Sequence, residues 1–237
     1  MHRVEGLMRR AINDYQMIQE GDKIAVALSG GKDSISLMYA LKSLQRYNNE
    51  HFDLIAITVN PGFEEFNENL LKTICQNAGV ELVIVPTNIK QIVFDERKEK
   101  NPCSLCANLR RGILNSTAKK YGCNKIALGH NEDDVIETFL MNLIYAGRIA
   151  TFSPVSYMDK SEITTIRPLI YVPEKQTKRF IKKADITVMP KVCPMDGKST
   201  REYALQLLKG IEIHNRKSRA NIMGAIKRAK LNGWKEI

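Results

Sequence analysis

Residues 23–34 read Lys-Ile-Ala-Val-Ala-Leu-Ser-Gly-Gly-Lys-Asp-Ser, and this stretch decides the fold class. The apolar run 23–28 has the length of a buried strand, and the residues from Asp33 to about 46 have the pattern of a helix. A glycine-rich turn between a strand and a helix is typical of a phosphate site, because the free N–H groups of the helix N-terminus face the anion. We therefore predict a phosphate-binding loop at residues 29–34.

The side chains of this loop support the same interpretation. Gly30 and Gly31 let the backbone turn and approach a phosphate closely. Lys32 adds a compact positive charge that can stabilise charge on a transferring phosphoryl group, and Ser29 and Ser34 add hydroxyl donors. The spacing differs from the Walker A motif, which has four residues between its first glycine and its Gly-Lys pair.

Asp33 places a carboxylate beside the expected phosphates. Such a contact is repulsive unless a metal ion bridges the two groups, so we expect the phosphate ligand to bind together with Mg²⁺. The alternative is a glycine-rich turn in which Asp33 only caps a helix.

Short apolar runs alternate with amphipathic ones over the first 146 residues. Further strands are expected at 53–59, 81–85, 125–128 and 164–171, and helices at 3–18, 64–77, 104–121, 132–145, 174–184, 199–209 and 215–231. This alternation predicts an α/β fold, a Rossmann-like parallel sheet with helices on both faces, whose ligands lie at the carboxyl ends of the strands. We divide the chain into a nucleotide-binding domain (1–172) and a small basic helical region (173–237).

A second loop, Gly-His-Asn-Glu-Asp-Asp at 129–134, follows the strand expected at 125–128. Gly129 permits close approach of a ligand, and Asp133 and Asp134 are candidates to hold Mg²⁺. The alternative is that these acids stabilise a helix N-terminus. We interpret His130 as a packed loop histidine without a catalytic role.

The cysteines are odd in number: Cys75, Cys103, Cys106, Cys123 and Cys193. An odd count, in a chain whose first residues lack the apolar stretch of a signal peptide, argues against a disulfide framework, and we expect a cytoplasmic protein. The spacing of Cys103 and Cys106 suits one metal ion or cluster, and Cys193 lies in a proline-bounded loop. Spacing alone leaves zinc, an iron–sulfur cluster and a redox dithiol open. The other two cysteines are interpreted as small buried apolar residues.

The charge is concentrated in the last quarter of the chain. Residues 1–173 hold 20 Lys/Arg and 20 Asp/Glu, whereas residues 174–237 hold 16 and 6, which accounts for the net charge of +10. This favours a polyanionic partner such as RNA over an ordinary solvated surface, because each neutralised phosphate releases counterions. The cations expected on the last helices are Arg201, Lys209, Arg216, Lys217, Arg219, Lys227, Arg228 and Lys230. No apolar run has the length of a membrane span, so no membrane partner is expected.

Together the two loops resemble those of the PP-loop ATPases, also called adenine nucleotide alpha hydrolases. Pro-Cys-Ser-Leu-Cys at 102–106, Leu-Arg-Arg-Gly at 109–112 and Ile-Arg-Pro-Leu at 166–169 are similar to the tRNA 2-thiocytidine synthetases (TtcA) and their relatives, the tRNA thiouridine sulfurtransferases of the TtuA group. The resemblance spans about residues 5–195.

The resemblance implies an enzyme that cleaves ATP between its α and β phosphates and transfers AMP to the O2 carbonyl of a tRNA pyrimidine. Sulfur then displaces AMP, and the expected product is 2-thiocytidine. It also implies that Cys103, Cys106 and Cys193 bind a [4Fe-4S] cluster with one iron left free to carry sulfide. The sulfur donor would be a cysteine desulfurase, a sulfur carrier or free sulfide, and a homodimer is expected because cluster-bearing relatives are often dimers.

The same resemblance assigns roles to individual residues. Asp33 matches an acid that helps catalysis, and Arg110 lies near a position that is lysine in the thiouridine branch. Gly129 and Asp134 match nucleotide contacts. The adenosine would lie beside two residues at the ends of strands, Ala27 and Val59.

The chain departs from the family pattern in three places. Its C-terminal part is shorter than in typical thiocytidine synthetases, it lacks the cysteine-rich zinc fingers of the thiouridine branch, and its segment around Cys193 differs. The target base therefore stays open between cytidine and uridine. Two other functions also stay open: an adenylating enzyme with a substrate other than tRNA, and a non-catalytic nucleotide-binding protein with a structural zinc.

Overall fold

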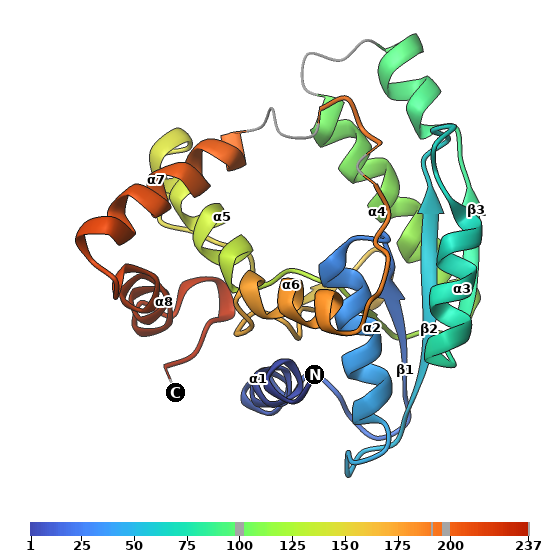
Figure 1. The fold of residues 1–237 in the computed structure, drawn as a ribbon, viewed down its shortest axis with the longest axis horizontal. Helices are drawn as coiled ribbons and strands as arrows, with labels where there is room; N and C mark the ends of the chain where they lie inside the picture. The colour runs from blue at the N-terminus through green and yellow to red at the C-terminus, as the bar shows by residue number, and fades with distance from the viewer. Residues whose placement is uncertain (98–101, 191, 196–199, 237) are drawn as a thin grey trace.

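The computed structural model describes residues 1–97, 102–190, 192–195 and 200–236. Its centre is a six-stranded sheet with the order β3-β2-β1-β4-β6-β5 (Figure 1). The strands are β1 (Asp22–Ala27), β2 (Phe52–Asn60), β3 (Glu81–Pro86), β4 (Lys125–Ala127), β5 (Val155–Met158) and β6 (Ile163–Ile166). All neighbouring strands are parallel except β5 and β6, which form an antiparallel hairpin. The strand order reverses between β1 and β4, and ligands of such sheets bind beside this point, at the carboxyl ends of the strands.

Helices cover both faces of the sheet. They are α1 (His2–Tyr15), α2 (Lys32–Leu44), α3 (Glu68–Ala78), α4 (Pro102–Lys120), α5 (Glu132–Tyr145), α6 (Glu174–Lys183), α7 (Thr200–His214) and α8 (Ser218–Arg228), with short helical turns at Gln91–Glu96 and Leu231–Gly233. Side chains alternate along β1, so Ile24 and Val26 join the larger core, which includes residues of α1, α2, α3 and α5. Ala25 faces the smaller core under α4, where it lies with Ala118. The predicted α/β class is thus confirmed.

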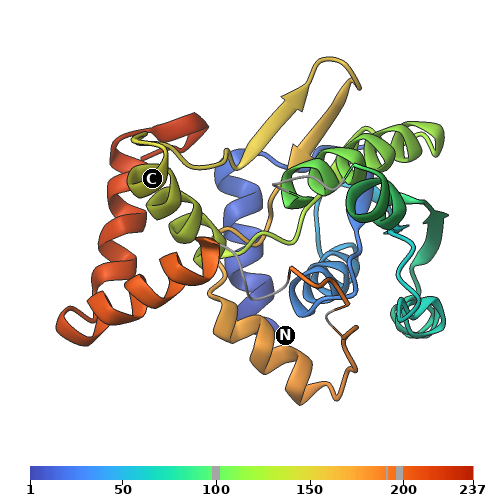
Figure 2. The same ribbon diagram turned by 90° about the horizontal axis from the view of Figure 1, so that it is seen from above.

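The C-terminal helices share the larger core. Helix α6 packs against α1 and α2, whereas α7 and α8 pack against α5 and against each other. Figure 2 shows α1 lying between α7–α8 and the part of the sheet that α4 covers. Leu208, Ile226 and Trp234 are buried in the larger core, and Trp234 donates its indole N–H to the carbonyl of Phe152 at 3.0 Å. Residues on both sides of position 172 therefore contribute to one core.

The structure differs from the sequence prediction around residues 155–171. Strand β5 was not predicted, and the strand expected at 164–171 ends at Ile166. The strand ends there because Pro168 has no N–H for a sheet ladder and the chain turns, with Ile170 donating to the carbonyl of Arg167 at 3.3 Å. The predicted helix after the cysteine pair also begins earlier, so the pair lies in the first turns of α4. Within the described ranges, no helix is both long and apolar enough to cross a membrane.

Candidate functional site

The phosphate loop joins β1 to α2 and is held by its own hydroxyl groups. Ser34 Oγ accepts a hydrogen bond from the Ser29 N–H at 3.2 Å and donates one to the Gly31 carbonyl at 3.0 Å. Gly30 has φ of +80°, and its carbonyl accepts from the N–H of Met189 at 2.9 Å. A Cβ at Gly30 would lie 2.8 Å from the Cβ of Met189. Glycine is therefore required here both by the backbone conformation and by the chain that packs on the loop.

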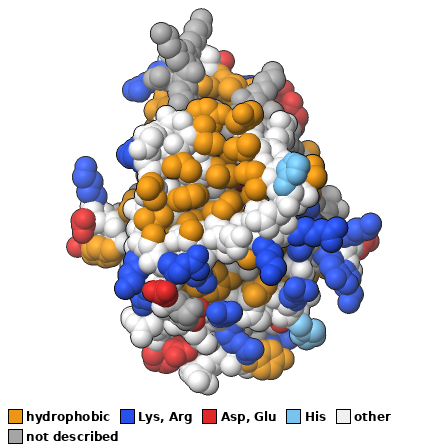
Figure 3. All heavy atoms as spheres, turned by 90° about the vertical axis from the view of Figure 1, so that its left-hand side faces the viewer, with side chains coloured by type: hydrophobic (Ala, Val, Ile, Leu, Met, Phe, Trp, Pro, Cys, Tyr) orange, Lys and Arg blue, Asp and Glu red, His pale blue; other side chains and the backbone are white. Residues whose placement is uncertain are grey.

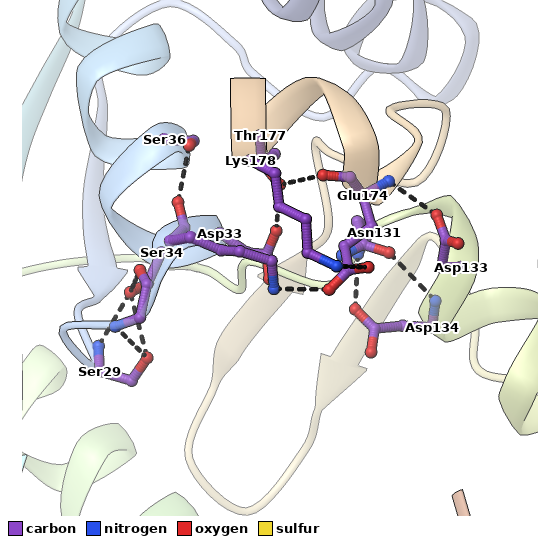
Figure 4. A network of polar contacts seen from close by, with 12 residues as sticks. Ser29, Asp33, Ser34, Ser36, Asn131, Asp133, Asp134, Glu174, Thr177 and Lys178 are labelled. Carbon is purple, nitrogen blue, oxygen red and sulfur yellow. Dashed lines mark hydrogen bonds and ion pairs between the residues drawn. The ribbon is translucent and has the colours of Figure 1, made fainter. Parts of the chain in front are cut away.

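Lys32 and Asp33 form a charged network with helix α6 (Figure 4). Lys32 Nζ lies 2.8 Å from a carboxylate oxygen of Asp33 and 2.8 Å from one of Glu174. Thr177 donates its hydroxyl to the other oxygen of Asp33 at 2.6 Å. Burial lowers the pKa of Lys32, but its hydrogen bonds to the two carboxylates outweigh this and raise the pKa, so the amine stays charged.

The second loop packs directly on the start of α2. A Cβ at Gly129 would lie 3.0 Å from the Ser34 nitrogen and 3.2 Å from the Asp33 carbonyl carbon. Helix α5 begins with a capping box, in which Asn131 Oδ1 accepts from the Asp134 N–H at 3.1 Å and Asp134 Oδ2 accepts from the Asn131 N–H at 2.9 Å. Burial raises the pKa of Asp134, and the charge of Asp33 raises it further. The two loops therefore bring Asp33 and Asp134 within electrostatic range of each other.

Replacing Gly129 with alanine should damage both the site and its stability. The nearest atoms belong to the backbone and cannot rotate away, so the new methyl group must push the second loop off α2. We expect a loss of about 1–3 kcal/mol in the free energy of unfolding, as for other overpacked sites. ATP affinity, measured by calorimetry, should fall in parallel. Gly210→Ala, where a Cβ meets nothing within 4 Å, is the matched control. An unchanged ATP affinity and melting temperature in Gly129→Ala would contradict this packing argument.

Asp133, the other predicted Mg²⁺ ligand, is engaged elsewhere. Its carboxylate accepts the N–H of Glu174 at 2.7 Å and forms an ion pair with Arg219, which also contacts Glu212 at 2.6 Å. The structure thus holds Asp133 against α6 and α8 and away from a role as a free metal ligand. The sequence contains no local signal for this difference, because the partners of Asp133 lie far along the chain.

Two of the cations that we predicted for RNA also have carboxylate partners. Arg201 lies 3.0 Å from Asp134 and 3.6 Å from Glu137 through Nη1 and Nε, and Arg219 is paired as described above. These two arginines therefore fix α7 and α8 to α5. Of the other cations in that prediction, Lys227 lies over the ring of Tyr171 at 3.9 Å, and the exposed ones are Lys209, Arg216, Lys217, Arg228 and Lys230.

A cavity of about 460 Å³ lies beside the phosphate loop. The predicted residues Ala27 and Val59 line it, as do Ser29, Gly31, Asp33, Ser34, Gly129 and Arg110. Its apolar lining also includes Phe66 and Leu114, which sequence analysis did not single out. A mostly apolar cavity of this size, open to a phosphate-binding helix N-terminus, has the form of a nucleotide site.

His130 contributes a neutral ring to the same cavity. Its ring centroid lies 4.9 Å from that of Phe152, and its Nδ1 is buried without a partner among the described residues. Burial lowers the pKa of His130 to about 3, and the charges of Arg167, Arg201 and Arg111 add to the effect. The histidine is therefore uncharged at neutral pH.

Glu132 at the start of α5 should make stability depend on pH. Burial raises its pKa from 4.5 to about 7, and the charge of Asp133 adds to the shift. The pKa of Glu132 is higher in the folded than in the unfolded chain. The contribution of this group to the free energy of unfolding is therefore fully present below about pH 4.5 and is lost as the pH rises through 7. Glu132→Gln should therefore melt higher than the unsubstituted protein at pH 8, with the difference shrinking at pH 5. Glu65→Gln, at an exposed loop position, should show no such pattern.

The three predicted cluster ligands lie near one another. Cys103 is exposed and Cys106 and Cys193 are half-buried. Burial raises the pKa of Cys106, the charge of Arg110 lowers it, and the neighbouring thiols Cys193 and Cys103 raise it. In Figure 1 the loop after α6, which carries Cys193, runs up beside the start of α4. Among the described residues, no three His, Cys, Asp or Glu side chains form a group that could hold a single metal ion.

The remaining cysteines are buried, as the sequence predicted. Cys75 is 1% exposed and Cys123 is 5% exposed. Burial raises the pKa of both thiols, that of Cys75 to about 11, so both are protonated at neutral pH.

Comparisons with known proteins agree with these loops. A family model described as a PP-loop domain matches residues 3–202. The tRNA-cytidine(32) 2-sulfurtransferase of Geobacter metallireducens is 36% identical over 220 residues, which are 92% of this chain and 86% of that protein. The protein of the same name from Aeromonas salmonicida is 39% identical over 201 residues, 84% of this chain and 67% of that one.

A solved structure shows the same fold. The U34-tRNA thiolase NcsA from Methanococcus maripaludis, determined with its [4Fe-4S] cluster, superposes with a TM-score of 0.76 at 25% sequence identity. The match covers 95% of this chain and 78% of that one. The family model, the similar sequences and the solved structure all point to one family, which the two loops also indicate. The chain belongs to the PP-loop domain family, in the group of the tRNA-cytidine(32) 2-sulfurtransferases.

Proposed function

We propose that this protein is a tRNA-thiolating enzyme, which uses ATP to replace the O2 oxygen of cytidine 32 with sulfur. One observation carries the proposal: helix α4 holds both the cysteine pair and a wall of the nucleotide cavity. Cys106 lies in the first turns of α4, and Arg110, one turn further along, lines the cavity. A sulfur bound at the thiols would therefore be close to the activated base, about one or two helical turns away.

ATP binding follows from the geometry of the two loops. Adenosine would lie in the apolar part of the cavity beside Ala27 and Val59, with its phosphates at the N-terminus of α2. Asp33 lines the cavity and offers a carboxylate for Mg²⁺, which commonly binds through one or two carboxylates plus substrate phosphates. Asp134 would have to release Arg201 to offer a second one. With Asp33 bound to a metal ion, Lys32 would keep Glu174 as its carboxylate partner and would have N–H donors left for the α-phosphate.

The reaction would then proceed in two displacements. The O2 oxygen of the cytosine attacks the α-phosphorus of ATP and pyrophosphate leaves, while Lys32 stabilises the negative charge on the phosphoryl oxygens. Sulfide next adds to C2, the C2–O2 bond breaks, AMP leaves with the former base oxygen, and a proton is released. The buried, apolar wall of the cavity would shield the adenylated base from hydrolysis.

The cysteine site fits an iron–sulfur cluster. Cubane clusters bind one thiolate per iron, so their ligands are spread over several metal atoms and need not converge on one point. Cys103, Cys106 and Cys193 would hold such a cluster, and Arg110 beside Cys106 favours anionic ligands. When bound, the cluster would supply a position for the incoming sulfur from an external donor.

We also propose that the protein is a homodimer. Figure 3 shows a broad apolar surface on the side of the molecule that carries α5 and α7. Exposed apolar side chains of these helices are Leu143, Ile144, Tyr145, Tyr203, Ile211 and Ile213. Large exposed apolar surfaces commonly mark protein interfaces, and a two-fold dimer would pair this surface with its own copy. Sedimentation analysis of the protein and of Tyr203→Ser would test the assignment; a monomer at micromolar concentration would refute it.

The test of function is an assay of AMP formation and base thiolation. Protein, ATP, Mg²⁺ and sulfide are incubated with a tRNA transcript that has cytidine at position 32, and with a matched transcript that has uridine there. We expect AMP and 2-thiocytidine only with the cytidine transcript. AMP released equally without tRNA would indicate a small-molecule acceptor, and ATP bound without AMP formation would indicate a non-catalytic nucleotide-binding protein.

A further inference from the structure

A second groove opens beside the nucleotide cavity. It has a volume of about 780 Å³ and lies between α4 and the β5–β6 hairpin. Figure 2 shows this hairpin projecting from the sheet next to α4. Arg111 lines both the groove and the nucleotide cavity, so the two spaces are adjacent at this side chain.

Contacts between α4 and the hairpin close one end of the groove. Asn115 donates to Ser161 at 3.3 Å, and Lys119 pairs with Glu162 at 2.6 Å. Arg111 and Lys119 are eight residues apart on the helix, about 12 Å along its axis. The groove therefore runs along α4 from beside the nucleotide cavity to these contacts.

Four cations in and around the groove and the nucleotide cavity have no acidic partners among the described residues. Among the described residues, no carboxylate oxygen lies within 4.0 Å of the side-chain nitrogens of Arg110, Arg111, Lys160 or Arg167. Asp159 is the one carboxylate among the described residues that line the groove. In contrast, the arginines of α7 and α8 that face the site are neutralised by α5.

Arg167 adds a half-buried cation at the root of the hairpin. Its Nη1 donates to the Ser153 carbonyl at 2.6 Å and to Ser156 Oγ at 3.1 Å, and its Nε is buried without a partner in the described part of the chain. Burial lowers the pKa of Arg167 to about 10, and the charge of Arg111 adds to the effect. Arg110, Arg111 and Lys160 are exposed, and Arg167 lies behind them. A set of cations without carboxylate partners favours the binding of an anion beside it.

The rest of the groove suits an unpaired nucleotide strand. Tyr157 is 60% exposed and lines the groove, and aromatic rings in such positions stack on bases. Asn108 and Asn115 offer amide groups for base edges or ribose hydroxyls. Gly112 leaves the groove open along α4, because a Cβ there would meet nothing within 4 Å.

We propose that this groove holds the tRNA strand next to the target base, with Arg111 and Lys160 against its phosphates and Tyr157 stacked on a neighbouring base. The inference rests on the proposed tRNA-thiolating function and places its substrate. In this proposal the groove, and not the C-terminal helices, is the main RNA-binding surface. Arg216 and Lys217 are exposed cations of the α7–α8 turn, at the left edge of Figure 1 and far from α4.

Two matched double variants test which surface binds RNA. Tyr157→Ala with Lys160→Ala removes the stacking ring and one cation of the hairpin, whereas Arg216→Ala with Lys217→Ala removes two cations of the α7–α8 turn. Affinity for labelled tRNA is measured by fluorescence anisotropy over a range of salt, and ATP affinity by calorimetry. We expect the hairpin variant to lose roughly tenfold or more in tRNA affinity and the turn variant to lose roughly two- to threefold. ATP affinity should be unchanged in both. The opposite order of tRNA affinities would overturn the proposal.

Gly112 provides a test that does not depend on removing contacts. Glutamine has a higher helix propensity than glycine, so Gly112→Gln should not lower the melting temperature, yet its side chain would enter the groove. We expect weaker tRNA binding in Gly112→Gln and near-normal binding in Gly112→Ala. If Gly112→Gln and the hairpin variant bind and thiolate tRNA as well as the unsubstituted protein does, the groove does not hold the tRNA strand. The proposed tRNA-thiolating function would then still stand. If the unsubstituted protein does not bind tRNA, the proposed function itself fails.

Discussion

Lys32→Ala is expected to reduce the rate of tRNA-dependent AMP formation by about 10²- to 10³-fold, the usual effect of removing one preorganised group that stabilises transition-state charge. Lys32 is the cation of the phosphate loop that two carboxylates, Asp33 and Glu174, hold at 2.8 Å. Its raised pKa keeps it charged across the neutral range, so no protonation step has to precede the reaction. The rate is measured under single-turnover conditions, with AMP and pyrophosphate quantified together.

Two controls separate this catalytic effect from loss of structure. Lys32→Arg keeps the charge but replaces a compact ammonium with a planar group, so it should restore only part of the rate. Lys182→Ala removes an exposed cation from α6 and should leave the rate unchanged. The iron content and tRNA affinity of Lys32→Ala should both be normal. Full product formation by this variant would exclude Lys32 from the adenylation step.

The parts of the site that the sequence predicted are those built from contiguous residues. The strand, glycines and helix around residues 29–34 carry the local signals of an anion site, and the loop at 129–134 carries those of a helix start. Both were placed correctly at the carboxyl ends of β1 and β4, and Ala27 and Val59 indeed line the cavity. The spacing of apolar residues along the chain also predicted most of the strands and helices, because each element must bury its apolar face.

The parts that the sequence missed depend on contacts between distant residues. Glu174 and Thr177 contact the phosphate loop from α6, at a sequence separation of more than 140 residues, and nothing in their local pattern indicates it. Arg201 and Arg219 looked available for RNA because a count of charges does not show which ones are paired. Strand β5 was missed because it has only four residues, so the hairpin that it forms with β6 and the groove between this hairpin and α4 were missed as well.

A second large effect is expected for Cys193→Ala, which should abolish thiolation while leaving ATP binding intact. Cys193 is the one predicted ligand that does not belong to α4, so its removal leaves only the Cys103–Cys106 pair. The protein is purified without oxygen, and bound iron, acid-labile sulfide and zinc are measured for the variant and the unsubstituted chain. The unsubstituted chain should hold about four irons and four sulfides, as one cubane cluster requires, and the variant should hold few.

The matched control is another cysteine-to-alanine change away from this site. Cys123 is buried just before β4, and Cys123→Ala should lower the melting temperature slightly but keep iron and activity. In Cys193→Ala, tRNA-dependent AMP release should persist without 2-thiocytidine, because adenylation by the two loops precedes sulfur transfer. Zinc in place of iron, or a thiolation rate that survives the loss of Cys193, would remove the sulfur-carrying site. Helix α4 would then connect the nucleotide cavity only to a structural metal, and the enzyme would have to take its sulfur directly from the donor.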